Sequence, residues 1–266
     1  MNTPITYYGG KQNMLRHILP NLPEDHKLYG EPYFGGGAVF FGKPVSEIEV
    51  INDLNKEVIN FYRILKERYE ELYEKIAITL HSREQHRWAS MIYANYDYFS
   101  KIERAWAFWT LSLQSFASNL IGGWAYDKAS GSIERRLRNK VDSMSREYSE
   151  RLRSTQIECN DAIKVIKSRD AKDSLFYCDP PYFNSEMGHY EGFSEDDFER
   201  LLTTLANIEG RFLLSSYPSD LLDKFAKKHK WHQIKVEAVV TVNSKKENLK
   251  TKVEMLTANY PLKEVA

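Results

Sequence analysis

The chain has 266 residues, long enough for one large domain or for a domain with a sizeable insertion, and for a core that needs no disulfide support. It carries 37 basic and 37 acidic residues, so it is not a polycation that binds nucleic acid through net charge. Two cysteines, Cys159 and Cys178, exclude a disulfide-rich secreted scaffold. The sequence starts without a secretory signal and has no apolar run of about 18 residues, so we expect a cytoplasmic protein without membrane spans.

Short apolar runs alternate with helical patterns at both ends of the chain. Strands are predicted at residues 27–34 and 47–51, followed by one amphipathic helix over 56–76. Further strands are predicted at 174–178, 211–214, 234–242 and 253–257, with a polar, lysine-rich loop before the last. A helix over 194–206 starts at Ser194, with Asp197 in the position of a capping box. This alternation indicates an α/β fold with a mostly parallel, doubly wound sheet.

The middle of the chain, residues 67–153, is predicted to be an inserted, mainly helical subdomain. It is rich in aromatic side chains, most of which we expect in its core. Glycines at 122–123 and at 131 flank a predicted hairpin. Two basic runs, 128–140 and 224–235, are each explained most simply as a solvated helix face.

The sharpest local feature is Asp179-Pro180-Pro181-Tyr182, directly after the predicted strand 174–178. Ligands of open parallel sheets bind outside the carboxyl ends of the strands. The prolines fix the backbone and remove two N–H donors, so a carboxylate and carbonyl oxygens stand side by side. These acceptors match the two N–H donors of a nucleobase amino group, and Tyr182 offers a flat face for stacking. The alternative is a rigid turn that carries a surface aspartate.

A second feature is the turn Gly35-Gly36-Gly37, which follows a predicted strand. Glycines let the backbone approach a ligand closely, but the Lys-Ser/Thr pair of a phosphate loop is missing. Asp53 ends the next predicted strand. There it is placed to accept hydrogen bonds from ribose hydroxyls, to cap the helix that starts near Asn55, or to do both. Together these residues indicate a site for a nucleoside cofactor.

In this order the segments resemble the Dam-like family of DNA adenine N6-methyltransferases. The matching segments are 7–11, 31–41, 52–55, 179–182 and 250–256, the last followed by Asn259-Tyr260. The resemblance implies a Rossmann-like, AdoMet-dependent catalytic domain formed by residues 1–66 and 154–266. It also implies S-adenosylmethionine as methyl donor and a flipped adenine in double-stranded DNA as acceptor.

Carried over residue by residue, the resemblance assigns Asp179 to the target amino group and Tyr182 to stacking on the base, with Pro180 and Pro181 in the same catalytic segment. Asp53 would bind the ribose, Lys11 the methionine carboxylate, and Asp161 the adenine amino group of the cofactor. The predicted cofactor set is completed by Tyr7, Tyr33, Phe34, Gly35, Gly37 and Asp179. Tyr7 stands where the family commonly has tryptophan.

Residues 67–153 would then be the target-recognition subdomain. With DNA as partner, Arg135, Arg136, Arg138 and Lys140 become candidate phosphate contacts or base readers. Trp124 and Tyr126 are candidates for a wedge beside the flipped base, or for packing under the turn. No metal site is predicted. Methylation of cytosine N4 and a catalytically idle DNA- or AdoMet-binding module stay open as alternatives, as do the recognised DNA sequence and a cognate restriction endonuclease acting on it.

Overall fold

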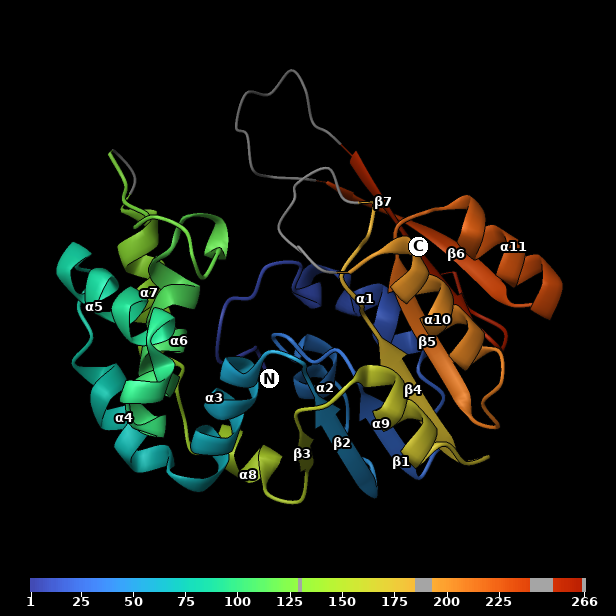
Figure 1. The fold of residues 1–266 in the computed structure, drawn as a ribbon, viewed down its shortest axis with the longest axis horizontal. Helices are drawn as coiled ribbons and strands as arrows, with labels where there is room; N and C mark the ends of the chain where they lie inside the picture. The colour runs from blue at the N-terminus through green and yellow to red at the C-terminus, as the bar shows by residue number, and fades with distance from the viewer. Residues whose placement is uncertain (129–130, 185–192, 240–250, 265–266) are drawn as a thin grey trace. The chain divides into compact units, whose positions relative to one another are not determined.

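A computed structural model describes residues 1–128, 131–184, 193–239 and 251–264 (Figure 1). The chain forms two compact units, each built from several segments. The first unit comprises Met1–Gln12, Gly35–Phe41 and Asp53–Cys159, and the second comprises Asn13–Phe34, Gly42–Asn52 and Asn160–Ala266. The first unit thus includes more of the chain than the segment 67–153, whose role as an inserted recognition subdomain stays a prediction. Among the described residues, every helix is too short or too polar to cross a membrane.

Six strands of the twisted sheet belong to the second unit and lie in the order β2-β1-β4-β5-β7-β6 (Figure 1). The strands are β1 (Leu28–Glu31), β2 (Ile48–Asn52), β4 (Ser174–Cys178), β5 (Arg211–Ser216), β6 (His232–Val239) and β7 (Thr251–Ala258). β2, β1, β4 and β5 are parallel to one another, whereas β7 is antiparallel to both β5 and β6. Every residue of β4 is buried, as expected for a central strand of a parallel sheet. The predicted α/β class and mostly parallel sheet are confirmed.

Three helices cover one face of this sheet: α9 (Ala162–Arg169), α10 (Glu195–Leu205) and α11 (Asp220–His229) (Figure 1). The strands alternate, so Phe176 and Cys178 of β4 point into the same apolar core as Phe198 of α10. Tyr177 points to the opposite face, where its hydroxyl bonds to Ser215 at 2.9 Å. At the start of α10, Ser194 and Asp197 form the predicted capping box. The unit also contains α1 (Leu15–Ile18).

The first unit is mainly helical. Its helices are α3 (Lys56–Glu67), α4 (Tyr69–Ala77), α5 (Arg83–Ala94), α6 (Lys101–Gln114), α7 (Ser132–Asp142) and α8 (Glu147–Leu152), with α2 (Ala38–Gly42) and β3 (Gln156–Glu158). α6 is its centre and packs against α3, α4, α5 and α7. Phe108 and Trp109 of α6 are fully buried, and the Trp109 indole donates to the Pro4 carbonyl oxygen at 3.2 Å. The aromatic side chains of the segment 67–153 that are exposed, and so do not fill its core, are Trp88, Tyr96, Tyr98, Phe116 and Tyr126.

One prediction of local structure is wrong, and a second one extends beyond the described residues. The predicted helix over 56–76 is two helices, because Arg68 adopts φ −136° and ψ 46°; the apolar periodicity continues across this break and gives no sign of it. The predicted hairpin between Gly123 and Gly131 includes residues 129–130, which lie outside the described residues; in its described part, Trp124 forms a single antiparallel bridge with Ser115. The lysine-rich loop 240–250, including Lys250 of the matched segment, and Ser130 lie outside the described residues.

Candidate active site

The predicted catalytic segment lies at the edge of the sheet where β4 and β5 end. Asp179 follows Cys178 directly, and β7, which is antiparallel to β5, begins at the same edge. The Tyr182 hydroxyl oxygen is 3.2 Å from Asp179 Oδ1 and 3.3 Å from Glu254 Oε2 of β7. The Tyr182 ring lies 4.3 Å from the Tyr217 ring, centroid to centroid, at 54°. The second unit thus brings Asp179 and Tyr182 together with Glu254 and Tyr217.

Sequence reasoning did not single out Glu254 or Tyr217. Both carried a signal in the sequence: Glu254 lies in the matched segment 250–256, and Tyr217 lies three residues after the predicted strand 211–214, directly after β5 as observed. Their place at this edge depends on β7 pairing with β5, with Ser216 opposite Met255. That pairing joins distant parts of the chain, so the sequence alone does not specify it.

Burial and nearby carboxylates raise the pKa values of the tyrosine hydroxyls at this edge. The pKa of Tyr182 is well above its ordinary value, first because the hydroxyl is buried and then because Asp179 and Glu254 disfavour a phenolate. The pKa of Tyr177 is raised mainly by burial too, with Asp179 as the second cause. Tyr182 therefore stays protonated and remains a hydrogen-bond donor at working pH.

A buried amide ties together the loops that carry three of the predicted cofactor residues. Asn52 Nδ2 donates to the Pro32 carbonyl oxygen at 2.9 Å and to the Asn160 carbonyl oxygen at 3.0 Å, and Asn52 Oδ1 accepts from the Asn160 N–H at 2.8 Å. The Asn52 carbonyl oxygen also accepts from the Phe34 N–H at 2.8 Å. Asn52 thus fixes the backbone on either side of Tyr33, and the residue before Asp161.

The three cofactor residues carried by these loops already have contacts within the second unit. The Tyr33 ring is edge-on to Phe193, with centroids 6.3 Å apart, and burial is the main reason why its pKa is raised. Phe34 is buried. Asp161 caps α9 by accepting from the Lys164 N–H at 3.0 Å. The half-buried Asp161 carboxylate therefore has a structural function, whether or not it contacts a ligand.

Apart from Asp179, which belongs to the second unit, the other predicted cofactor residues lie in the first unit. Gly35 has φ +47°, and a Cβ added there would lie 2.9 Å from the Tyr7 ring, so only glycine fits beneath Tyr7. Gly35 N–H donates to Asp53 Oδ2 at 2.8 Å, and Asn55 N–H donates to Asp53 Oδ1 at 2.9 Å. Burial raises the pKa of Asp53, although these backbone bonds act to lower it. The helix cap is Asn55 itself, whose side chain accepts from the Glu57 N–H, so the alternative role of Asp53 as N-cap is wrong.

Lys11 follows the turn formed by residues 7–10. Gly10 N–H donates to the Tyr7 carbonyl oxygen at 3.0 Å, and Gly9 between them has φ +74°. The buried Lys11 ammonium donates to the Gly9 carbonyl oxygen at 2.8 Å. The turn therefore fixes the position of this cation within the first unit.

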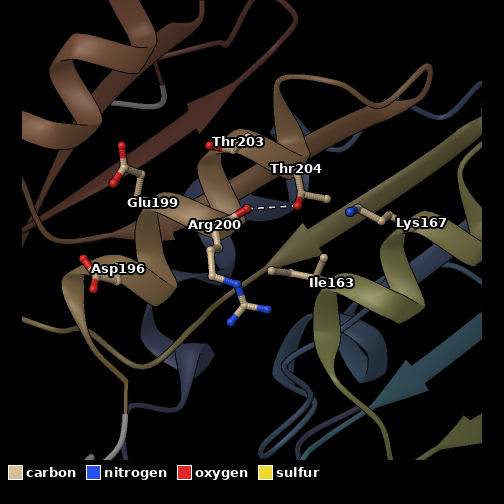
Figure 2. Close-up of a pocket in the computed structure, with 7 residues that line it drawn as sticks. All are labelled: Ile163, Lys167, Asp196, Glu199, Arg200, Thr203 and Thr204. Carbon is tan, nitrogen blue, oxygen red and sulfur yellow. Dashed lines mark hydrogen bonds between the residues drawn. The ribbon is translucent and has the colours of Figure 1, made fainter.

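A hollow of about 420 Å³ lies away from the catalytic segment, between α9 and α10 (Figure 2). Its walls carry charges of both signs, and Arg200 extends from α10 beside Ile163 of α9. The Thr204 hydroxyl is bonded to the Arg200 carbonyl oxygen at 2.9 Å. None of the predicted catalytic or cofactor residues lines this hollow, and we assign it no function. Among the described residues no group of three or more His, Cys, Asp or Glu side chains is arranged to hold a metal ion.

The predicted basic run lies on α7 of the first unit, where its members have different contacts. Arg136 donates to the Leu113 carbonyl oxygen at 2.8 Å, and Lys140 donates to the Thr3 carbonyl oxygen. Arg138 pairs with Glu134 one turn away, and Arg135 is exposed. Two of the four cations are thus half-buried and bonded to the backbone of their own unit.

Trp124 and Tyr126 belong to an aromatic stack. Their rings are 5.5 Å apart and nearly parallel, His81 lies 4.8 Å from Trp124 on centroids, and the Arg83 guanidinium is 4.7 Å from the Trp124 ring centroid. The Trp124 indole donates to Gln114 Oε1 at 3.3 Å. Trp124 is half-buried in these contacts, while the Tyr126 side chain is 53% exposed. Packing therefore accounts for Trp124 better than for Tyr126.

Comparisons with known proteins show the family to which the chain belongs. Residues 7–242 match the family described as D12 class N6 adenine-specific DNA methyltransferase. The chain is 30% identical over 276 residues to the Type II methyltransferase M1.LlaDCHI of Lactococcus lactis subsp. cremoris, covering 95% of this chain and 93% of that protein. It is 29% identical over 222 residues to the DNA N-6-adenine-methyltransferase of Escherichia phage P1, covering 76% of this chain but 28% of the phage protein. It is 25% identical over 273 residues to the DNA adenine methylase of Salmonella typhi, covering 96% and 94% of the two chains. The chain therefore belongs to the D12 class of N6 adenine-specific DNA methyltransferases.

Proposed function

We propose that the protein transfers the methyl group of S-adenosylmethionine to N6 of an adenine flipped out of a specific site in double-stranded DNA. The observation that carries the proposal is the position of Asp179. Its carboxylate directly follows β4, at the edge where parallel sheets bind ligands, and it is joined to a Pro-Pro segment whose backbone offers only carbonyl oxygens. Tyr182 brings an aromatic ring to the same edge.

Methyl transfer requires that the protein activate the adenine amino group, which is a poor nucleophile. The lone pair of an adenine amino group is delocalised into the ring, and acceptors bonded to both amino hydrogens favour a pyramidal nitrogen with a localised lone pair. Asp179 and the Pro180 carbonyl oxygen would be these acceptors, and a hydrogen bond to the charged partner contributes about 1.5–3 kcal/mol. Once alkylated, the nitrogen is strongly acidic, so the Asp179 carboxylate would take its proton without being a strong base.

The residues of the first unit fit a nucleoside cofactor. The Gly35 N–H is already directed at Asp53, so the backbone there is ordered, and the absence of a side chain at Gly35 leaves room for the Tyr7 ring. Asp53 would accept hydrogen bonds from the ribose hydroxyls, and the Lys11 ammonium would pair with the methionine carboxylate. When bound, S-adenosylmethionine would supply an electrophilic methyl group on its sulfonium.

The second unit would contribute the remaining cofactor contacts. Tyr33 and Phe34 would pack against the cofactor, and Asp161 would accept from its adenine amino group. Asn52 supports this assignment, because it fixes the backbone beside all three of these residues.

The test of the proposed function is analysis of the product. Purified protein is incubated with S-adenosylmethionine and DNA of random sequence, and the digested nucleosides are identified by mass spectrometry. We expect N6-methyldeoxyadenosine from the wild type and from Asp196→Ala, which removes an exposed acid on α10, and none from Asp179→Ala. A product methylated at cytosine N4, no product at all, or near-normal turnover in Asp179→Ala would each refute the proposal.

DNA contact by α7 is the second part of the proposal. We propose that Arg135 and Arg138, on its exposed side, contact phosphates. Losing one phosphate contact weakens binding to all sequences and reduces the slope of log K against log salt by about 0.9. Arg135→Gln should behave in this way, and Lys224→Gln, on exposed α11 surface, is the matched control. An unchanged salt slope in an Arg135→Gln/Arg138→Gln variant would place α7 away from the DNA.

The recognised site follows from long-read sequencing of DNA methylated by this protein, which reports base and sequence context together. We propose that a restriction endonuclease acting on the same site is its biological counterpart. Methylated DNA should then resist cleavage by an endonuclease of that specificity, and cleavage at the normal rate would exclude this relationship.

A further inference from the structure

Glu254 lies beside the catalytic segment without a role in the proposed reaction. It is on β7, directly before Met255, which pairs with Ser216 at the end of β5. Glu254 therefore lies at the edge of the sheet where Asp179 follows β4. Its Oε2 is 3.3 Å from the Tyr182 hydroxyl oxygen, and the strand that carries it is held between β5 and β6. Its position is therefore set by the sheet rather than by a surface loop.

The Tyr182 hydroxyl faces two carboxylates but has one proton to donate. Its oxygen is 3.2 Å from Asp179 Oδ1 and 3.3 Å from Glu254 Oε2, both longer than the usual O–H···O separation of about 2.7–2.8 Å. The two acceptors therefore compete for one hydrogen bond. When Asp179 receives it, one of its lone pairs is occupied and the carboxylate is a weaker acceptor for a substrate amino group.

We propose that Glu254 is a positioning residue for methyl transfer: by accepting the Tyr182 hydroxyl it holds that ring in place and leaves Asp179 available for the amino group of the target base. The inference rests on the proposed function and adds a residue to it. Glu254 acts through Tyr182 and touches neither the base nor the cofactor.

The prediction that separates this role from a purely structural one is dependence on the Tyr182 hydroxyl. Glu254→Ala should slow single-turnover methyl transfer about tenfold to a hundredfold, as expected for the loss of a hydrogen bond to a charged acceptor. Glu254→Gln keeps a neutral acceptor and should restore part of the rate. In a Tyr182→Phe background, where no hydroxyl remains, Glu254→Ala should change the rate by less than about twofold.

The experiment measures the four rates of this cycle, with S-adenosylmethionine affinity and melting temperature for each variant. Glu237→Ala, an exposed acid on neighbouring β6, is the matched control and should leave the rate unchanged. Cofactor affinity and melting temperature should match the wild type throughout. An unchanged rate in Glu254→Ala, or an equal slowing in both backgrounds, overturns the inference.

Wild-type product analysis comes first and separates the two proposals. When the wild type forms N6-methyladenine and the Glu254 series fails, the inference alone is wrong. When the wild type forms none, the proposed function fails and the inference falls with it.

Discussion

Replacing Asn52 should loosen the backbone around the predicted cofactor residues. The side chain is 1% exposed and makes three hydrogen bonds, two to backbone carbonyl oxygens and one from a backbone N–H. A typical intramolecular hydrogen bond contributes about 1 kcal/mol net, and a buried group that loses its partner costs about 1–3 kcal/mol. Asn52→Ala should therefore lower the unfolding free energy by about 2–4 kcal/mol.

Asn52→Asp gives a sharper version of the same test because it preserves size. Its carboxylate would still accept from the Asn160 N–H, but the amide nitrogen becomes an oxygen that faces the carbonyl oxygens of Pro32 and Asn160. Two hydrogen bonds thereby become repulsive contacts. We expect Asn52→Asp to be destabilised at least as much as Asn52→Ala, although it alters only one group of the side chain.

The assay is urea unfolding followed by circular dichroism, with the change in midpoint converted at constant m. Asn207→Ala is the matched control: its amide donates to the Thr203 carbonyl oxygen on exposed surface, and its loss should cost about 0.5 kcal/mol or less. S-adenosylmethionine affinity, measured by titration calorimetry, should fall for both Asn52 variants and not for the control. A destabilisation of Asn52→Ala no larger than the control, or an Asn52→Asp as stable as the wild type, would refute the reasoning.

Three further predictions address single groups. Lys11→Ala and Asp53→Ala should each weaken S-adenosylmethionine binding at least about tenfold in calorimetry, a loss expected for a hydrogen bond to a charged group. Unchanged affinity in both variants would show that the cofactor binds elsewhere. Burial lowers the pKa of Lys140 from 10.5 to about 8, so between these values the unfolded chain binds more protons, and the melting temperature relative to Lys140→Met should rise from pH 7.5 to pH 10. A flat difference would mean that Lys140 is not desolvated. Ser194→Ala should cost about 1 kcal/mol in urea unfolding through loss of the capping box with Asp197, while an unchanged midpoint would show that the cap contributes nothing.

Features set by neighbouring residues were predictable from the sequence. β4 spans Ser174–Cys178 as predicted, because the apolar run and the Asp179-Pro180 step that follows it determine where the strand ends. The capping box of Ser194 and Asp197 was predictable for the same reason, since its two bonds join residues three positions apart. The helix break at Arg68 was not predictable, because a change in the backbone of one residue does not disturb the apolar periodicity around it.

Contacts between residues that are distant in the chain could not be predicted from the sequence. Asn52 and Asn160 are 108 positions apart, and Tyr182 and Glu254 are 72 positions apart. Both Asn52 and Glu254 lie in segments that resemble the family, so the resemblance marked the segments, but only the fold shows what each side chain contacts. Tyr217 carried a weaker signal still, as one aromatic residue after an apolar strand.

Asp53 and Asp161 show why a residue that supports the backbone remains a candidate for binding. A carboxylate offers about four lone-pair sites. Asp53 accepts from the N–H groups of Gly35 and Asn55, and Asp161 accepts from the N–H of Lys164. Both carboxylates thus keep acceptor capacity while their own backbone bonds hold them in place. A side chain fixed before the ligand arrives loses little conformational freedom on binding, so the structural bond and the proposed ligand bond support each other.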